Sequence, residues 1–257
     1  MRPCLASPLH IRAAAFGGPQ PLFCVPLVAE TPDQLLDQAH AAHRLEPDVV
    51  EWRADSYEGA GGSSFVHALR RLRAVLDPAP VIFTLRISTE GGARPIRQDV
   101  RADGIDAVLR SGHADLVDLE LSNGPGFLQP LIETAHAHGA RVILSFHDFD
   151  AMPSQEFLLA TIAAMVRQGG DIAKIACMPN EPGDVLRLMQ ATLAARRAFP
   201  AIPLCTMAMG GIGSISRVAG FLYGSDMAFA AGPAVSAPGQ IPIAEARALA
   251  EGLLRYA

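Results

Sequence analysis

Short apolar runs rich in β-branched residues recur eight times along the 257 residues, and each is followed by a segment whose apolar residues repeat every three or four positions. This strict alternation of strands and helices predicts a parallel sheet with right-handed crossovers. Eight strand–helix units in about 250 residues match the size of a (β/α)8 barrel. The predicted strands are residues 21–28, 48–53, 81–86, 115–121, 141–147, 172–178, 203–210 and 226–231.

Helix-like segments separate the predicted strands. The first of them, residues 31–45, begins with Thr31 as an N-cap and Pro32 at the first helical position. Apolar residues at three- and four-residue spacing predict the others. They lie near residues 63–77, 96–111, 125–138, 154–168, 182–198, 214–223 and 242–255.

The rival fold is an open doubly wound sheet, which needs a glycine-rich phosphate turn after its first strand. Residues 28–32, with the sequence Val-Ala-Glu-Thr-Pro, are not such a turn. No shift in composition marks a domain boundary. We therefore expect one (β/α)8 TIM barrel domain over residues 1–257, with residues 1–20 as an N-terminal extension that caps the barrel floor.

Composition argues against several classes of partner. The net charge is −5 and no cluster of basic residues is interleaved with aromatic ones, so we expect no nucleic-acid partner. No apolar stretch reaches the roughly 18 residues of a membrane span, and residues 1–20 lack the apolar core of a secretory signal. The four cysteines show no CxxC spacing, which is typical of free thiols in a reducing compartment. We expect a cytoplasmic protein.

Lys174 lies in the middle of the apolar run of residues 171–179. Lysine is almost never fully buried unless it is paired or functional. Desolvation lowers the pKa of an amine, and this frees the lone pair for attack on a carbonyl carbon. The strand by itself leaves two interpretations open: an imine-forming amine, or a lysine that reaches solvent or a carboxylate.

Polar residues gather where the predicted strands end, and active sites of such barrels form at those ends. Each has a structural explanation when taken alone. Glu51 can pair with Arg53, and hydrogen bonding in the barrel interior is the interpretation we favour for Asp118 and Glu120. Their convergence on one mouth nevertheless argues for function. The residues are Glu51, Arg53, Arg86, Ser88, Glu90, Asp118, Glu120, Ser145, His147, Asp148, Lys174, Ser214, Ser216, Arg217, Ser236 and Gln240.

This set of residues supports imine chemistry on an anionic substrate. A protonated imine on Lys174 is an electron sink that acidifies the neighbouring C–H bond. Histidine titrates near neutral pH, so His147 is suited to move that proton, with Glu90 to orient it. Guanidinium groups bind carboxylates through paired hydrogen bonds, and three arginines lie at the same mouth: Arg53, Arg86 and Arg217.

Seven segments occur in an order that is specific to one family. They are residues 51–55, 83–86 with 90–92, 145–149, 174–179, 206–210, 216–220 and 236–240. In sequence and order they resemble type I 3-dehydroquinate dehydratase, and the resemblance covers the chain from about residue 21 to its end. Residues 1–20 match no part of the family that we can name.

The resemblance implies a (β/α)8 barrel, a homodimer, and the dehydration of 3-dehydroquinate to 3-dehydroshikimate in the shikimate pathway of aromatic amino acid biosynthesis. It implies no metal and no organic cofactor. Lys174 falls on the Schiff-base lysine, His147 on the general acid/base and Glu90 on the glutamate beside it. The segment 234–241 is expected to close over the substrate. Substrate-binding positions of the family fall on Glu51, Arg53, Arg86, Arg217, Ser236 and Gln240.

Four alternatives stay open at this stage. A class I aldolase shares the imine but breaks a C–C bond, and a quinate-catabolic dehydratase shares the reaction in another pathway. A metal-dependent barrel enzyme would use Glu51, Glu120 and His147 as ligands, although Lys174 nearby disfavours a cation. A non-catalytic relative would bind the same compound without turnover.

Overall fold

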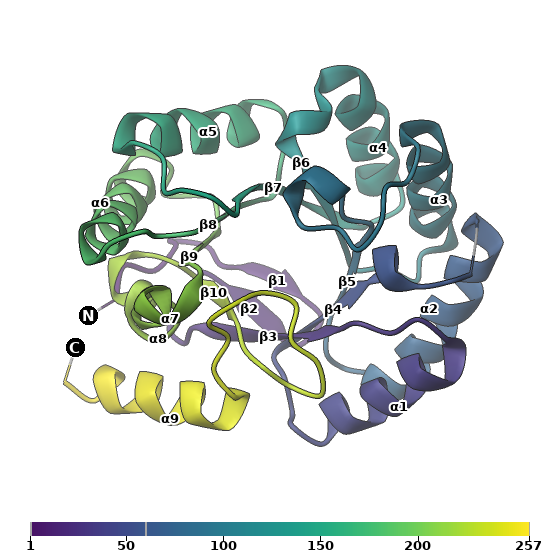
Figure 1. Cartoon of the computed structure of the whole chain (residues 1–257), viewed down its shortest axis with the longest axis horizontal. Helices are drawn as coiled ribbons and strands as arrows, with labels where there is room; N and C mark the ends of the chain where they lie inside the picture. Colours follow the sequence, from purple (N-terminus) through teal and green to yellow (C-terminus); the bar gives the residue numbers. More distant parts are fainter. Residues whose placement is uncertain (1, 60, 257) are drawn as a thin grey trace.

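The computed structural model describes residues 2–59 and 61–256 and contains a ring of eight parallel strands surrounded by helices (Figure 1). The predicted barrel and its eight strands are confirmed. In chain order the strands of the ring are β3 (Leu22–Leu27), β4 (Val49–Arg53), β5 (Val81–Thr84), β6 (Leu116–Glu120), β7 (Arg141–Asp148), β8 (Ile172–Cys177), β9 (Leu204–Ala208) and β10 (Met227–Phe229).

Each strand from β3 to β8 pairs with the next one along the chain, and β10 pairs back onto β3. The remaining neighbours, β9 and β10, meet at their beginnings, where the Asp226 amide donates to the Leu204 carbonyl at 2.6 Å. The ring is therefore nearly closed. The helices that cover it are α1 (Pro32–His43), α2 (Gly62–Leu76), α3 (Gln98–Ser111), α4 (Pro125–Ala137), α5 (Gln155–Arg167), α6 (Pro182–Ala198) and α9 (Ile243–Leu254).

The helix predicted at residues 214–223 is wrong in its continuity. Within that range the structure has two short pieces, α8 (Ile215–Ala219) and the 3-10 turn η4 (Gly220–Tyr223), and a third, α7 (Gly210–Gly213), precedes them. Glycine is a poor residue for a helix interior, and residues 210–223 contain four. At Gly213 a β-carbon would lie 2.5 Å from the Ala208 carbonyl, so close packing against β9 requires glycine there.

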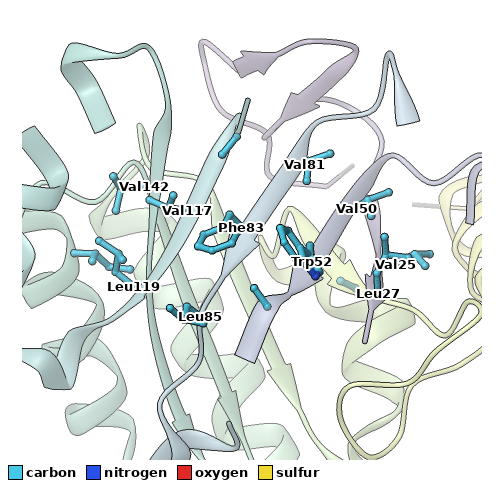
Figure 2. Packing of buried hydrophobic residues seen from close by; sticks show 14 of the residues in the cluster. Val25, Leu27, Val50, Trp52, Val81, Phe83, Leu85, Val117, Leu119 and Val142 are labelled. Atoms are coloured by element: carbon cyan, nitrogen blue, oxygen red, sulfur yellow. The ribbon is translucent and has the colours of Figure 1, made fainter. Parts of the chain in front are cut away.

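The two faces of the strands carry different side chains because successive residues point to opposite sides. Outward residues pack beneath the helices in one large apolar cluster (Figure 2). Trp52 is fully buried in it, with its ring edge-on to Tyr57 at 5.4 Å, Phe65 at 6.0 Å and Phe83 at 5.4 Å between ring centroids. This cluster fixes the outer ring of helices on the barrel.

Inward residues change from apolar to polar along each strand. The inward positions at the beginnings of β3 to β8 are Leu22, Val49, Ile82, Leu116, Ile143 and Ile172, which share one buried cluster. One step further along the same inward face come Glu51, Thr84, Asp118, Ser145 and Lys174. The barrel thus has an apolar floor and a polar layer above it, toward the carboxyl ends of the strands.

The N-terminal segment forms an antiparallel hairpin, β1 (Leu9–Ile11) and β2 (Ala14–Phe16). Ile11, Ala14 and Phe16 belong to the same buried cluster as the first inward residues of the strands, so the hairpin packs against the amino-terminal end of the barrel. None of the helices in the described residues is long and apolar enough to cross a membrane.

We expect Phe16→Ala to lower the free energy of unfolding by about 3–5 kcal/mol, because the fully buried ring leaves a cavity between hairpin and floor. Trp52 is the single tryptophan of the chain and reports denaturant unfolding by its fluorescence. The matched control is Phe157→Ala, since Phe157 is 48% exposed and should cost far less. Equal losses in the two variants would contradict a packed hairpin.

Candidate active site

The carboxyl ends of the strands surround a small pocket. All nine residues that the sequence singled out as catalytic or substrate-binding line it, from six strands or the loops that follow them. Six further residues complete the wall. The predicted residues are Glu51, Arg53, Arg86, Glu90, His147, Lys174, Arg217, Ser236 and Gln240, and the others are Phe149, Ala176, Met207, Met209, Ala237 and Phe229.

A wider depression lies at the opposite end of the barrel. It is lined by the hairpin, by residues 43–48 and by residues 76–79. None of the predicted residues lies there. The chemistry that the sequence predicts is therefore concentrated at the carboxyl end of the barrel, as the direction of parallel strands requires.

Lys174 lies inside the barrel, on β8, and is only 4% exposed. Its Nζ donates to Asp118 Oδ2 at 2.8 Å and to Glu51 Oε1 at 3.4 Å. The ring of Phe229 lies on another side, with its centroid 4.3 Å from Nζ. The amine is thus surrounded by two carboxylates and an aromatic face, all of which favour its charged form.

The expectation that burial lowers the pKa of Lys174 is wrong for this structure. Burial by itself does act in that direction, but Asp118 and then Glu51 outweigh it, and the pKa lies above its ordinary value. Sequence reasoning missed the sign because it saw the apolar neighbours along the strand and not the carboxylates across the barrel. At neutral pH the structure therefore holds an ammonium group.

Arg86 organises the interior beside Lys174. It forms ion pairs with Asp118 at 2.9 Å and with Glu120 at 2.9 Å, and its Nη1 donates to Ser145 at 2.8 Å. Burial lowers the pKa of Arg86, but the two carboxylates outweigh it and raise the value. The second oxygen of Glu120 accepts from Arg101 at 2.7 Å.

These pairs bear on the metal-dependent alternative. Both carboxylate oxygens of Glu120 are held by arginines, and one oxygen of Glu51 faces the ammonium of Lys174. Among residues 2–59 and 61–256 no three His, Cys, Asp or Glu side chains are grouped so that they could hold a metal ion.

His147 projects from the end of β7 and is held by Glu90. Its Nδ1 lies 3.0 Å from Glu90 Oε2, and its backbone amide donates to the same oxygen at 3.0 Å. Burial lowers the pKa of His147 well below its ordinary value, and the cations of Arg86 and Lys174 add to this. The ring is therefore neutral at neutral pH. With Nδ1 bonded to a carboxylate, Nε2 carries the lone pair of a base.

Glu90 ends the 3-10 turn η2 (Ser88–Glu90), and the next residue fixes its position. Gly91 has φ of 85°, and a β-carbon on it would lie 2.4 Å from the ring of Phe149. Glycine is needed for both reasons. Ser122, on the turn η3 (Leu121–Asn123), donates to Glu90 Oε1 at 2.5 Å, the oxygen that His147 does not contact.

The pKa of Glu90 is raised to about 7 by burial, while the hydrogen bond from Ser122 and the charge of Arg86 oppose that shift. Sequence reasoning missed Ser122. Its position directly after a barrel strand, two residues beyond Glu120, was the one signal that could have found it.

Arg217 is the pocket arginine without a carboxylate partner among the described residues. Its Nη1 donates to the Phe229 carbonyl at 3.2 Å and its Nη2 to the Pro238 carbonyl at 3.0 Å, and it is 3% exposed. Burial lowers its pKa to about 10. A buried cation bonded only to neutral groups is a favourable receptor for an anion.

Arg53 and the polar residues of segment 234–241 are already engaged with protein groups. Arg53 does not pair with Glu51: it forms two hydrogen bonds of 2.9 Å with Asp55. Gln240 accepts from the Ser236 amide at 3.0 Å and donates to its hydroxyl at 3.2 Å. Gly239 packs on α7, where its β-carbon would lie 2.2 Å from the Gly210 carbonyl oxygen.

Comparison with known proteins agrees with this geometry. A family model described as type I 3-dehydroquinase matches residues 23–253. The 3-dehydroquinate dehydratase of Geobacillus kaustophilus (strain HTA426) is 42% identical over 250 residues, which cover 96% of each chain.

Two solved structures extend the likeness to three dimensions. The crystal structure of 3-dehydroquinate dehydratase from Geobacillus kaustophilus HTA426 aligns with a TM-score of 0.95 at 39% identity, over all of both chains. That of type I 3-dehydroquinate dehydratase from Clostridium difficile with covalently modified comenic acid gives 0.93 at 31% identity, over 97% of this chain and 98% of that one. The barrel, the pocket around Lys174 and these likenesses agree, and the chain belongs to the type I 3-dehydroquinase family.

Proposed function

We propose that the protein converts 3-dehydroquinate to 3-dehydroshikimate through an imine on Lys174, as a dehydratase of the shikimate pathway. One observation carries the proposal. A single pocket joins a buried lysine, a neutral histidine held by a carboxylate, and a buried arginine whose partners are all neutral. These are the electron sink, the proton carrier and the carboxylate receptor that the reaction needs.

The roles follow from position. The Lys174 ammonium first gives up a proton to water, and the neutral amine then attacks the C3 ketone. His147 assists the loss of water from the carbinolamine to give the iminium. His147 then takes a proton from C2 at Nε2 and returns it to the C1 hydroxyl as that group leaves. Water hydrolyses the product imine and restores the amine. Every proton that leaves carbon is thus returned to an oxygen of the substrate.

Arg217 is placed to bind the substrate carboxylate, with its Pro238 contact exchanged for the carboxylate. Glu51 faces the pocket and is placed to accept from substrate hydroxyl groups, as are Ser236 and Gln240 once their mutual bonds open. Arg53 and Arg86 contribute positive charge at the pocket wall, although their strongest bonds are to protein carboxylates.

The remaining parts of the proposal concern assembly and location. The family resemblance supports a homodimer, which light scattering of the purified protein tests directly. The four cysteines are free in the structure, which favours a reducing compartment such as the cytoplasm. The class I aldolase alternative is distinguished by its product, since only dehydration gives a conjugated enone.

We expect borohydride added together with 3-dehydroquinate to inactivate the protein irreversibly, because it reduces a protonated imine to a stable amine. Lys174 is the only lysine in the chain, so the added mass has one side chain on which to appear. Peptide mapping by mass spectrometry locates it. The control is Lys174→Arg, whose guanidinium forms no such imine. Turnover without any trapped adduct would contradict the assignment of Lys174 as the imine-forming residue.

The turnover rate kcat should fall as the pH is lowered through about 7, because protonation of Glu90 removes the carboxylate that holds His147 Nδ1–H. Glu90→Gln cannot titrate. It should lower the maximal rate and abolish this acidic limb, which a pH–rate profile of both proteins measures. If the limb persists unchanged in Glu90→Gln, another group is responsible for it.

Arg217→Ala should raise KM by roughly tenfold or more, because a charge-assisted carboxylate contact contributes about 1.5–3 kcal/mol. Steady-state kinetics with 3-dehydroquinate measures the change. Arg110→Ala is the matched control, since its side chain is 59% exposed and pairs only with Asp106 on the surface. A fall in kcat alone, with KM unchanged, would contradict a binding role for Arg217.

A further inference from the structure

The two carboxylates that contact Lys174 are not equivalent. Asp118 Oδ2 lies 2.8 Å from Nζ, and Asp118 is buried beneath the pocket rather than lining it. Glu51 lies further from Nζ, at 3.4 Å, and lines the pocket wall. A substrate that enters the pocket can therefore reach Glu51 but not Asp118.

Asp118 is also fixed in place. Its Oδ1 accepts from Ser145 at 2.5 Å, and its Oδ2 forms an ion pair with Arg86 at 2.9 Å. Arg86 is itself bound by Glu120, which Arg101 holds from the other side. A carboxylate with this many strong partners cannot turn away from Nζ when the amine reacts.

The charge around Nζ suits a cation. Beside the two carboxylates stand the Phe229 ring and the thiol of Cys205, whose pKa burial raises to about 12. The guanidinium of Arg86 acts in the opposite direction, but Asp118 and Glu51 outweigh it. Burial opposes ionisation of Asp118, but Arg86 and then Lys174 lower its pKa far below the ordinary range. Asp118 thus stays anionic and is a poor proton acceptor.

This arrangement is unfavourable for the first step of imine chemistry and favourable for the later ones. Attack on a ketone needs a neutral amine, whose formation a fixed anion opposes. A protonated imine carries the same positive charge on the same nitrogen, and the same anion stabilises it. Loss of the C2 proton and of the C1 hydroxyl both depend on that charge.

We propose that Asp118 is a catalytic residue whose carboxylate is the fixed counter-ion of the protonated imine on Lys174, whereas Glu51 leaves Nζ to bind substrate. The inference rests on the proposed function and adds a residue to it. It replaces the purely structural role that the sequence favoured for Asp118.

The test is Asp118→Asn, which keeps the shape and removes the charge. Imine formation should be retained, because the amine is more easily deprotonated, so borohydride with 3-dehydroquinate should trap at least as much Lys174 adduct as in the wild type. The turnover rate should fall by about 10²-fold or more, the scale of one lost electrostatic contact to a developing charge. Two results for Asp118→Asn would overturn the proposal: less trapped Lys174 adduct than in the wild type, or a kcat within threefold of the wild-type value.

Glu120→Gln is the matched control. It removes a buried carboxylate from the same strand and the same ion-pair network, but Glu120 does not contact Nζ. Glu120→Gln should lower the thermal midpoint, but it should not combine full trapping of the Lys174 adduct with a strongly lowered kcat, as Asp118→Asn does. If both variants trap the adduct fully and both lose turnover, general loosening of the interior is the cause, and a specific role for Asp118 is refuted.

A second measurement needs no substitution in the interior. Protein grown with ¹⁵N-lysine has one side-chain amine signal, because the chain has one lysine. That signal should remain that of an ammonium group from neutral pH to about pH 9, below the ordinary lysine pKa of about 10.4. A neutral amine at pH 7 would overturn the proposal even if Asp118→Asn fails to fold. If the wild type itself does not dehydrate 3-dehydroquinate, the proposed function fails instead.

Discussion

A layer of buried opposite charges across the barrel determines how the rest of the pocket is built. Three carboxylates, on Glu51, Asp118 and Glu120, meet three cations, on Arg86, Arg101 and Lys174, with all six side chains buried. Buried ion pairs are tolerated when the charges balance and every group is hydrogen-bonded. Because the layer balances only with Lys174 charged, the state of one amine is coupled to five other side chains.

The pleat of the strands makes this layer possible. Alternation directs Val50, Trp52 and Phe83 outward beneath the helices and brings the intervening polar residues inward. The apolar floor and the hairpin below it keep water away from one side of the layer. The other side opens into the pocket. Glu51 lines that pocket, whereas Asp118 is enclosed, so solvent screens the charge of Glu51 more than that of Asp118.

The strands and most helices could be predicted from the sequence because their signals are local. The continuity of the helix at 214–223 could not, since Gly213 and Gly224 on either side of it fit close contacts that only the folded chain reveals. The site residues could be gathered at one mouth because parallel strands end together. Their partners could not be predicted: Lys174 meets Asp118 and Glu51 from 56 and 123 residues away, and those contacts reverse the expected direction of its pKa.

Twenty of the 21 basic side chains, Lys and Arg together, are arginines, and the remaining one is Lys174. A guanidinium does not condense with simple ketones, whereas every exposed lysine does so to some extent. Reactive carbonyl metabolites therefore meet no competing side-chain amine on the surface of this protein. The selectivity for one amine therefore depends on the composition of the whole chain as well as on the pocket. An amine-directed label, crosslinker or sugar has only Lys174 Nζ and the amino terminus to modify.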